Sequence, residues 1–279
     1  MDHLTMLDVS PPELVVIAAK AGFDCVGLRV SAAGPEEKPW PMKQGSPMLE
    51  ETLRLLKDTG IRVLDVEVLR IGPETTLDDY EHILETGALL GARYLTVNSD
   101  DPDLERASET FAVLSSNARS YGLRPLIEPI PYTRVSNLKD AIHIARRSGG
   151  GGILLDCLHF QRYGGDLGML RALDPQLFSY LQLCDAPLSP PTGLPRPQRL
   201  PRGQSTDGTD LQLESRALRL LPGEGELPLR EILESLPPEM PVSVEAPNME
   251  LRKTLTPVEF ARRAWQAVDE LLHQGLDVG

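Results

Sequence analysis

The stretch RVLDVEVLRIGPETTLDDYEHILETGALLGARYLTVNS, residues 62–99, decides the fold, because two apolar, β-branched runs flank a segment of helical period. The runs at 62–71 and 93–99 have the composition of strands. The segment 76–91 begins with Thr76 and closes on Gly91, as helix-capping preferences require. A strand, a helix and a second strand in this order predict a βαβ unit with parallel strands.

The same alternation continues along the chain and predicts eight strands and eight helices. Strand–helix pairs repeated eight times predict an α/β fold, a (β/α)8 TIM barrel, and 279 residues can form it as one domain, 1–279. An open doubly wound sheet is the alternative, but no G-x-G-x-x-G follows an early strand. The predicted strands are 3–7, 25–30, 62–71, 93–99, 125–129, 153–156, 180–185 and 242–247, and the predicted helices are 11–22, 47–60, 76–91, 103–122, 137–149, 166–173, 228–236 and 256–275.

One connection breaks the alternation. The Pro/Gly-rich segment at about 186–210 has no period and is much longer than the usual βα loop of about 2–6 residues. Because it follows the carboxyl end of a predicted barrel strand, it is a candidate lid. A disordered surface insertion is the other interpretation.

Composition narrows the classes of partner. The 41 acidic and 28 basic residues give a formal net charge of −13, which disfavours nucleic acid and anionic membranes and favours a small-molecule substrate. The three cysteines lack metal or disulfide spacing, and no apolar run approaches the ~18 residues of a membrane helix. We therefore expect a cytoplasmic protein; a homo-oligomer is left open.

Polar side chains alternate with apolar ones in the predicted strands. In YLQLCD, 180–185, Leu181 and Leu183 share the face that meets the helices, so Gln182 points into the barrel. These inward polar residues fall near the carboxyl ends of their strands, where this fold builds active sites. The same sorting turns inward Arg29, Asp65, Glu67, Thr96, Asn98, Glu128, Asp156, Gln182 and Glu245.

Buried carboxylates require a cation or hydrogen-bond donors. Arg29 is the one evident strand arginine in the inward set, so a divalent metal ion is the expected partner. The four residues at the ends of the last four predicted strands all offer oxygen, which favours Mg²⁺ or Mn²⁺ over Zn²⁺. A hydrogen-bonded polar network without metal is the alternative. The predicted metal ligands are Glu128, Asp156, Gln182 and Glu245.

Several motifs together resemble the xylose isomerase-like TIM barrels, a superfamily with sugar (phosphate) isomerases and epimerases, inosose dehydratases and endonuclease IV. The resemblance implies the same four metal ligands and a substrate-facing or acid–base role for His159. The motifs are IEP with Glu128, LLDCLHF with Asp156 and His159, YLQLCDAP with Gln182 and Asp185, LPGEGELPL at 221–229, and VSVEAP with Glu245.

One departure from the family pattern bears on the reaction. Many members carry a histidine ligand where this chain has Gln182, which puts zinc and a standard sugar epimerase in doubt. A glutamine ligand is similar to the arrangement in bacterial 3-dehydroshikimate dehydratases of the superfamily. Endonuclease IV is disfavoured, because the chain is acidic and its five histidines are too few for a cluster of zinc ions.

The resemblance therefore implies a divalent-metal-dependent isomerase or epimerase of a sugar or related polyhydroxy carbonyl compound. The expected chemistry is proton abstraction next to the carbonyl, with a metal-stabilised enediolate and Glu128, Glu245 and His159 as catalytic groups. A 3-dehydroshikimate or inosose dehydratase-like lyase and a non-catalytic sugar-binding barrel are the alternatives.

Substrate contacts are expected from residues around the same mouth. Four of them have a second interpretation: Arg29 pairs with Glu67, His159 donates a hydrogen bond to a loop carbonyl, Asp185 orients a neighbour, and Arg219 is a solvated helix arginine. The predicted substrate-binding residues are Arg29, Glu67, Asn98, His159, Asp185 and Arg219.

Overall fold

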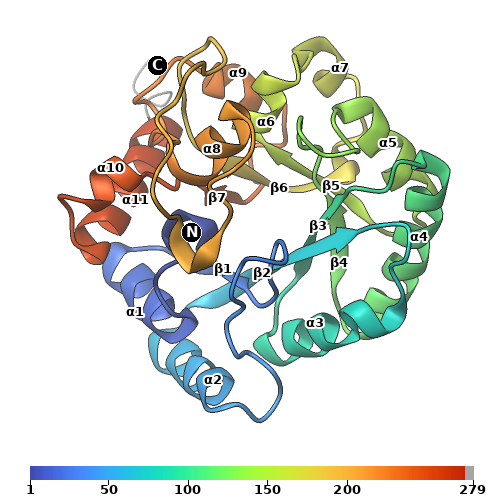
Figure 1. Ribbon diagram of the computed structural model, residues 1–279, viewed down its shortest axis with the longest axis horizontal. Coiled ribbons are helices and arrows are strands. Elements are labelled where there is room, and N and C mark those ends of the chain that lie inside the picture. The colour runs from blue at the N-terminus through green and yellow to red at the C-terminus, as the bar shows by residue number, and fades with distance from the viewer. Residues whose placement is uncertain (274–279) are drawn as a thin grey trace.

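The computed structural model describes residues 1–273, and within them seven parallel strands form a nearly closed barrel surrounded by helices (Figure 1). Each strand pairs with the next one along the chain, so strand order follows sequence order. The predicted α/β TIM barrel is confirmed. The strands are β1 Cys25–Arg29, β2 Arg62–Ile71, β3 Tyr94–Ser99, β4 Arg124–Ile127, β5 Gly152–Asp156, β6 Phe178–Leu183 and β7 Val242–Val244.

The helices lie outside the barrel or follow the carboxyl ends of strands (Figure 1). Residues 274 and 275 of the predicted last helix lie outside the described residues. No helix within residues 1–273 has the length and apolar character that a membrane span needs. The α-helices are α1 Pro11–Ala21, α2 Pro47–Thr59, α3 Leu77–Leu90, α4 Leu104–Ser120, α5 Leu138–Arg147, α6 Cys157–Arg162, α7 Leu167–Arg171, α8 Asp210–Ala217, α9 Leu229–Leu233, α10 Met249–Arg252 and α11 Pro257–His273; the 3-10 helices are η1 His3–Met6, η2 Pro175–Leu177 and η3 Pro201–Gly203.

The first predicted strand, 3–7, is wrong, because residues 3–6 form the 3-10 helix η1 and Leu7 is its C-cap. The Asp2 carboxylate accepts the backbone N–H of Leu4 and caps this helix, which outweighs the strand preference of so short a run. Residues 1–2 bridge the last and first strands instead: the Asp2 N–H donates to the Val244 carbonyl, and the Gly27 N–H donates to the Met1 carbonyl, each at 2.9 Å.

The barrel interior has an apolar floor beneath its polar mouth. Tyr180 belongs to this small buried cluster, and its hydroxyl lies 3.1 Å from the hydroxyl of Thr96. Three members of the floor precede the inward residues Glu128, Asp156 and Gln182 by two positions along the chain, so the polar residues form the next layer toward the carboxyl ends. The floor consists of Leu64, Leu126, Leu154 and Tyr180.

The Pro/Gly-rich insertion passes over the side of the mouth next to η1, where its gold ribbon is visible in Figure 1. The Arg202 guanidinium donates to the carbonyls of Lys38 and Pro39, each at 3.0 Å, and lies 3.7 Å from the centre of the Trp40 ring. These contacts join the insertion to the loop between β1 and α2. They place its end beside the cavity, although a lid function stays a prediction.

Candidate functional site

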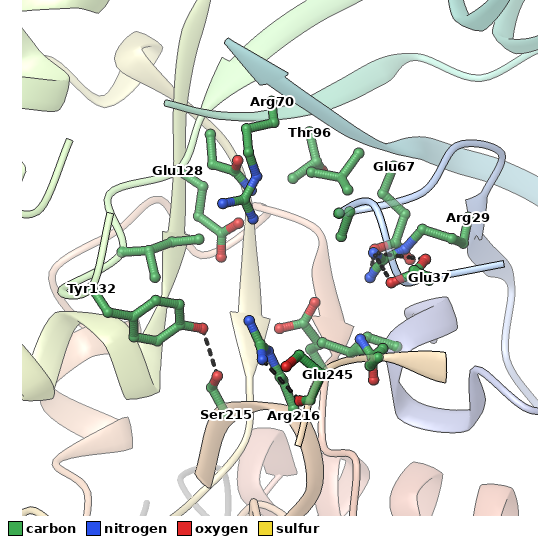
Figure 2. A pocket seen from close by; sticks show the side chains of 18 of the residues that line it. Arg29, Glu37, Glu67, Arg70, Thr96, Glu128, Tyr132, Ser215, Arg216 and Glu245 are labelled. Atoms are coloured by element: carbon green, nitrogen blue, oxygen red, sulfur yellow. Dashed lines mark hydrogen bonds and ion pairs between the residues drawn. The ribbon is translucent and has the colours of Figure 1, made fainter. Parts of the chain in front are cut away.

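A cavity of about 320 Å³ opens at the carboxyl ends of the strands, where the sequence predicts the site (Figure 2). Strand ends and the loops that follow them supply its walls. Asp156 and Gln182 are buried beside this cavity rather than in its lining, and Asp185 lies apart from the lining. The predicted residues that line it are Arg29, Glu67, Asn98, Glu128, His159, Arg219 and Glu245.

Arg219 is the central cation of the site. Its side chain is 1% exposed, and its two terminal nitrogens lie 2.5 Å from an Asp156 oxygen and 2.7 Å from a Glu245 oxygen. Its Nε donates to the Ser215 carbonyl at 2.8 Å. The interpretation of Arg219 as a solvated helix arginine is therefore wrong. Arg219 lies two residues after the end of α8, in a segment whose sequence shows no strand periodicity.

Asp185 holds the segment that carries Arg219. Its carboxylate accepts backbone N–H groups of Ala186, Gly223 and Leu227 at 2.8–3.0 Å, and its backbone exchanges two 2.8 Å hydrogen bonds with Leu220. The structure thus has Asp185 fixing the LPGEGELPL segment, 221–229, next to Arg219. This agrees with the interpretation that Asp185 orients a neighbour.

Glu128, Asp156 and His159 form the first cluster of potential metal ligands, with ligand atoms within 4.8 Å of one another. Burial raises the pKa of Glu128 to about 8, and the nearby Asp156 carboxylate adds to this rise. Burial also acts to raise the pKa of Asp156, but the attraction of Arg219 outweighs it and the pKa is lowered. Burial lowers the pKa of His159 to about 4, so its imidazole is neutral at pH 7.

Asp2, Glu67 and Glu245 form the second cluster. The Gln182 side-chain nitrogen donates to Asp2 and to Glu245, each at 3.0 Å. Burial raises the pKa of Glu245 and of Glu67, while Arg219 and Arg29 respectively oppose the rise. Asp2 and Glu245 thus share one amide donor, and a guanidinium group flanks each of Glu245 and Glu67.

Arg29 pairs with carboxylates of its own chain. Its guanidinium lies 3.0 Å from Glu67 and 3.5 Å from Glu37, and all three side chains are buried. Of the two interpretations of Arg29, the structure shows the pairing with Glu67. A role in holding a substrate stays a prediction.

Several residues of the cavity and of the second cluster are not predicted from the sequence. Asp2 precedes a segment that the sequence assigns to a strand, and Tyr132, whose hydroxyl lies 2.6 Å from Ser215, belongs to a loop. Arg70 is near the end of β2, where the register with β3 shifts between Val66 and Leu69, so simple alternation no longer gives its face. Loop residues carry no period, Ser215 and Arg216 lie in α8, which no predicted helix covers, and only Arg70 has a signal, its position near a strand end. The missed residues include Asp2, Glu37, Arg70, Tyr132, Ser215 and Arg216.

The donor set fits a divalent cation, because buried carboxylate oxygens surround the mouth and polar atoms there lack partners. Within residues 1–273, the side-chain oxygens Oε1 of Gln182, Oε1 of Glu67 and Oδ1 of Asn98 are buried without a hydrogen-bond partner. The two clusters divide the predicted ligands: Glu128 and Asp156 fall in the first, Glu245 in the second. That the four act as one ligand set stays a prediction.

The architecture and the site define a class: an α/β barrel with a buried, carboxylate-rich centre at the carboxyl ends of its strands. The family profile of the xylose isomerase-like TIM barrel matches residues 15–268, and the chain belongs to this family. A comparison with curated proteins finds no match.

Solved structures with the same fold have low sequence identity to the chain. The IolI protein with a bound zinc atom has a TM-score of 0.73 at 20% identity, covering 98% of this chain and 97% of that one. The probable 3-DHS dehydratase AsbF from Bacillus anthracis has 0.69 at 14%, covering 96% and 97%. A D-allulose 3-epimerase from Methylomonas sp. in complex with D-allulose has 0.67 at 11%, covering 96% and 95%.

Proposed function

We propose that the chain is a divalent-metal-dependent isomerase or epimerase of a sugar or related polyhydroxy carbonyl compound. The observation that carries this proposal is a pair of buried glutamates with raised pKa values in one cavity. Glu128 directly follows β4 and Glu245 directly follows β7, so they approach the cavity from different strands (Figure 2). The family and its epimerase members of known structure support the same chemistry.

Raised pKa values suit these glutamates to proton transfer. A carboxyl group that titrates near neutral pH, as Glu128 does, is populated in both protonation states, so it can take a proton from carbon and return one. In the metal-free protein Glu128, with a pKa of about 8, is mainly protonated at pH 7, whereas a bound cation would favour its ionised form and a role as base. Neutral His159 offers a hydrogen bond to a substrate hydroxyl, and Arg219 keeps Asp156 ionised.

Glu128, Asp156, Glu245 and the free oxygen of Gln182 would hold the metal ion. When bound, it would supply positive charge next to the carbonyl oxygen, where negative charge develops as the neighbouring proton leaves. Oxygen donors favour Mg²⁺ or Mn²⁺. Because Arg219 already pairs with Asp156 and Glu245, metal binding competes with this guanidinium for the same carboxylates.

A lyase is the second candidate. Gln182 is the observation that favours it, because an amide replaces the histidine ligand of many epimerases and resembles the dehydratase arrangement. Loss of a β-hydroxyl needs a proton donor at the leaving oxygen, and the acid–base groups Glu128 and His159 line the cavity in which that oxygen would lie. The likeness to the dehydratase of Bacillus anthracis is compatible with this candidate.

The first experiment measures metal content and carbon-bound proton exchange. Purified protein is analysed for divalent metal, loaded with Mn²⁺, and incubated in deuterated water with a panel of ketoses, aldoses and inososes, with exchange followed by NMR. Glu245→Gln should abolish exchange, whereas Glu231→Gln on the exposed side of α9 should retain it. If no metal is retained and no compound exchanges, the catalytic proposal fails and a sugar-binding barrel takes its place.

The second experiment separates isomerase from lyase. The Mn²⁺-loaded protein is incubated with 3-dehydroshikimate, and the ultraviolet absorbance of an aromatic product is followed. Its formation, with loss in Glu128→Gln, assigns the lyase. Absence of product together with exchange on a sugar assigns the isomerase or epimerase.

A further inference from the structure

A strongly basic pocket adjoins the catalytic cavity. It has a volume of about 820 Å³ and lies between η1, the insertion around η3 and the segment at 247–253. Its walls carry six cationic side chains against the single carboxylate of Asp8, in a chain whose net charge is −13. The cationic residues are Lys38, Arg199, Arg202, Arg216, Arg252 and Lys253.

Three of the six cationic side chains form ion pairs, carbonyl hydrogen bonds or ring contacts within the protein. Arg252 pairs with Asp8 at 2.9 Å, and Lys253 pairs with Glu250 at 2.7 Å. The Arg202 guanidinium binds two carbonyls and lies over Trp40. Within residues 1–273, the other three, Lys38, Arg199 and Arg216, form no ion pair with a carboxylate.

Arg216 connects the two spaces. The basic pocket and the catalytic cavity share Leu4, Gln204 and Arg216 in their walls. Arg216 is half-buried in α8, donates to the Ser205 carbonyl at 3.1 Å, and lines the same cavity as Glu245 (Figure 2). The other cavity arginines already have carboxylate partners: Arg29, Arg70 and Arg219 pair with Glu67, Asp100 and Asp156.

We propose that the basic pocket is an oxyanion subsite, and that the compound turned over carries a phosphate or carboxylate at the end remote from its carbonyl. Arg216 and Arg199 bind this group, and Lys38 adds positive charge at the rim. Guanidinium groups match the oxygens of either anion in a bidentate geometry. A local excess of cations in an acidic protein also concentrates anions at this entrance.

The subsite rests on the proposed function only for the statement that its ligand is the substrate. Anion binding itself is measurable without turnover and without metal. Because three cations lack carboxylate partners, the charge of the pocket favours multiply charged anions such as phosphate and malonate.

The test is calorimetric titration of the full chain after EDTA treatment, at constant ionic strength, with inorganic phosphate and separately with malonate. Arg199→Ala and Arg216→Ala are compared with Arg230→Ala, which removes an equal charge from the exposed face of α9. We expect the wild type to bind phosphate, each pocket variant to bind it about tenfold more weakly, and the control to match the wild type.

Each outcome decides the proposal. Tighter binding of phosphate assigns a phosphate-bearing ligand, and tighter binding of malonate assigns a carboxylate-bearing one. No binding of either probe, or an equal loss in Arg230→Ala, overturns the subsite. Arg199 lies in an exposed loop, so Arg199→Ala keeps the test valid if Arg216→Ala does not fold. Anion binding with no metal uptake or proton exchange would leave the subsite standing while the catalytic proposal fails.

Discussion

The guanidinium of Arg219 lies 2.5 Å from the carboxylate of Asp156, and both side chains are buried in the barrel mouth. The other terminal nitrogen of the same guanidinium forms an ion pair with Glu245. Removing one partner of a buried ion pair leaves an uncompensated buried charge. The free-energy cost of that charge is far larger than the net stabilisation that the intact pair gives compared with apolar residues in the same place. Arg219 therefore stabilises the carboxylates that the proposed reaction requires.

Arg219→Met should lower the free energy of unfolding of the metal-free protein by about 3–5 kcal/mol, measured by urea denaturation. Asp156 and Glu245 lose their cation in this variant, so added Mn²⁺ should restore part of the loss. Arg171→Met, at an exposed position, is the control. A change in Arg219→Met no larger than in the control would contradict the structural role of this cation.

Gln182→Met keeps the side-chain volume but removes two hydrogen bonds to the carboxylates of Asp2 and Glu245. We expect the free energy of unfolding to fall by about 2 kcal/mol or more, because hydrogen bonds to charged groups are stronger than neutral ones. Urea denaturation measures the change, with Gln266→Met on the exposed face of α11 for comparison. Equal stability of the two variants would show that the amide is dispensable for the carboxylate cluster.

Gly225→Ala should disrupt the loop that Asp185 holds. A Cβ at Gly225 would lie 2.4 Å from an Asp185 oxygen and 2.6 Å from the Ala186 carbonyl oxygen, so the backbone itself must move. Such overpacking costs about 1–3 kcal/mol. Thermal unfolding should show a lower midpoint than in Gly72→Ala, where the new Cβ meets no atom within 4 Å. Equal midpoints in the two variants would mean that the loop rearranges around the new Cβ without loss of stability.

Asp101→Asn should change how stability depends on pH. Hydrogen bonds from the Arg106 guanidinium lower the pKa of Asp101 in the folded protein. The carboxylate therefore stabilises the fold above its unfolded pKa of about 3.9, and this contribution is lost as the pH falls through the lower, folded value. The unfolding midpoint of the variant should lie below that of the wild type at pH 7, and the difference should shrink below about pH 4.

Thermal scans between pH 3 and pH 7 measure this convergence. Asp78→Asn, at an exposed position in the first turn of α3, is the matched control and should follow the wild type across the range. A gap between Asp101→Asn and the wild type that is the same at pH 3 and pH 7 would show that the ion pair with Arg106 is not its source.

The repeated strand–helix pattern determined the barrel, and the alternation of side chains determined which residues point inward. Both are local properties, because successive strand side chains point to opposite faces whatever surrounds them. Gln182 between Leu181 and Leu183, and Glu128, Asp156 and Glu245 near strand ends, are therefore placed correctly as buried interior residues. The same reasoning assigned a strand to 3–7, where the Asp2 cap produced a 3-10 helix instead.

Tertiary structure alone decided what those inward residues meet. Arg219 follows a long aperiodic insertion. The backbone bridge between Asp185 and Leu220 places the Arg219 side chain next to Asp156. The basic pocket likewise assembles residues from η1, the insertion and the segment after β7. Charge pairing across a barrel depends on how distant loops pack, and no sequence period encodes that. The sequence by itself determined the barrel and its inward carboxylates; the packing of its loops decided which cations reach them.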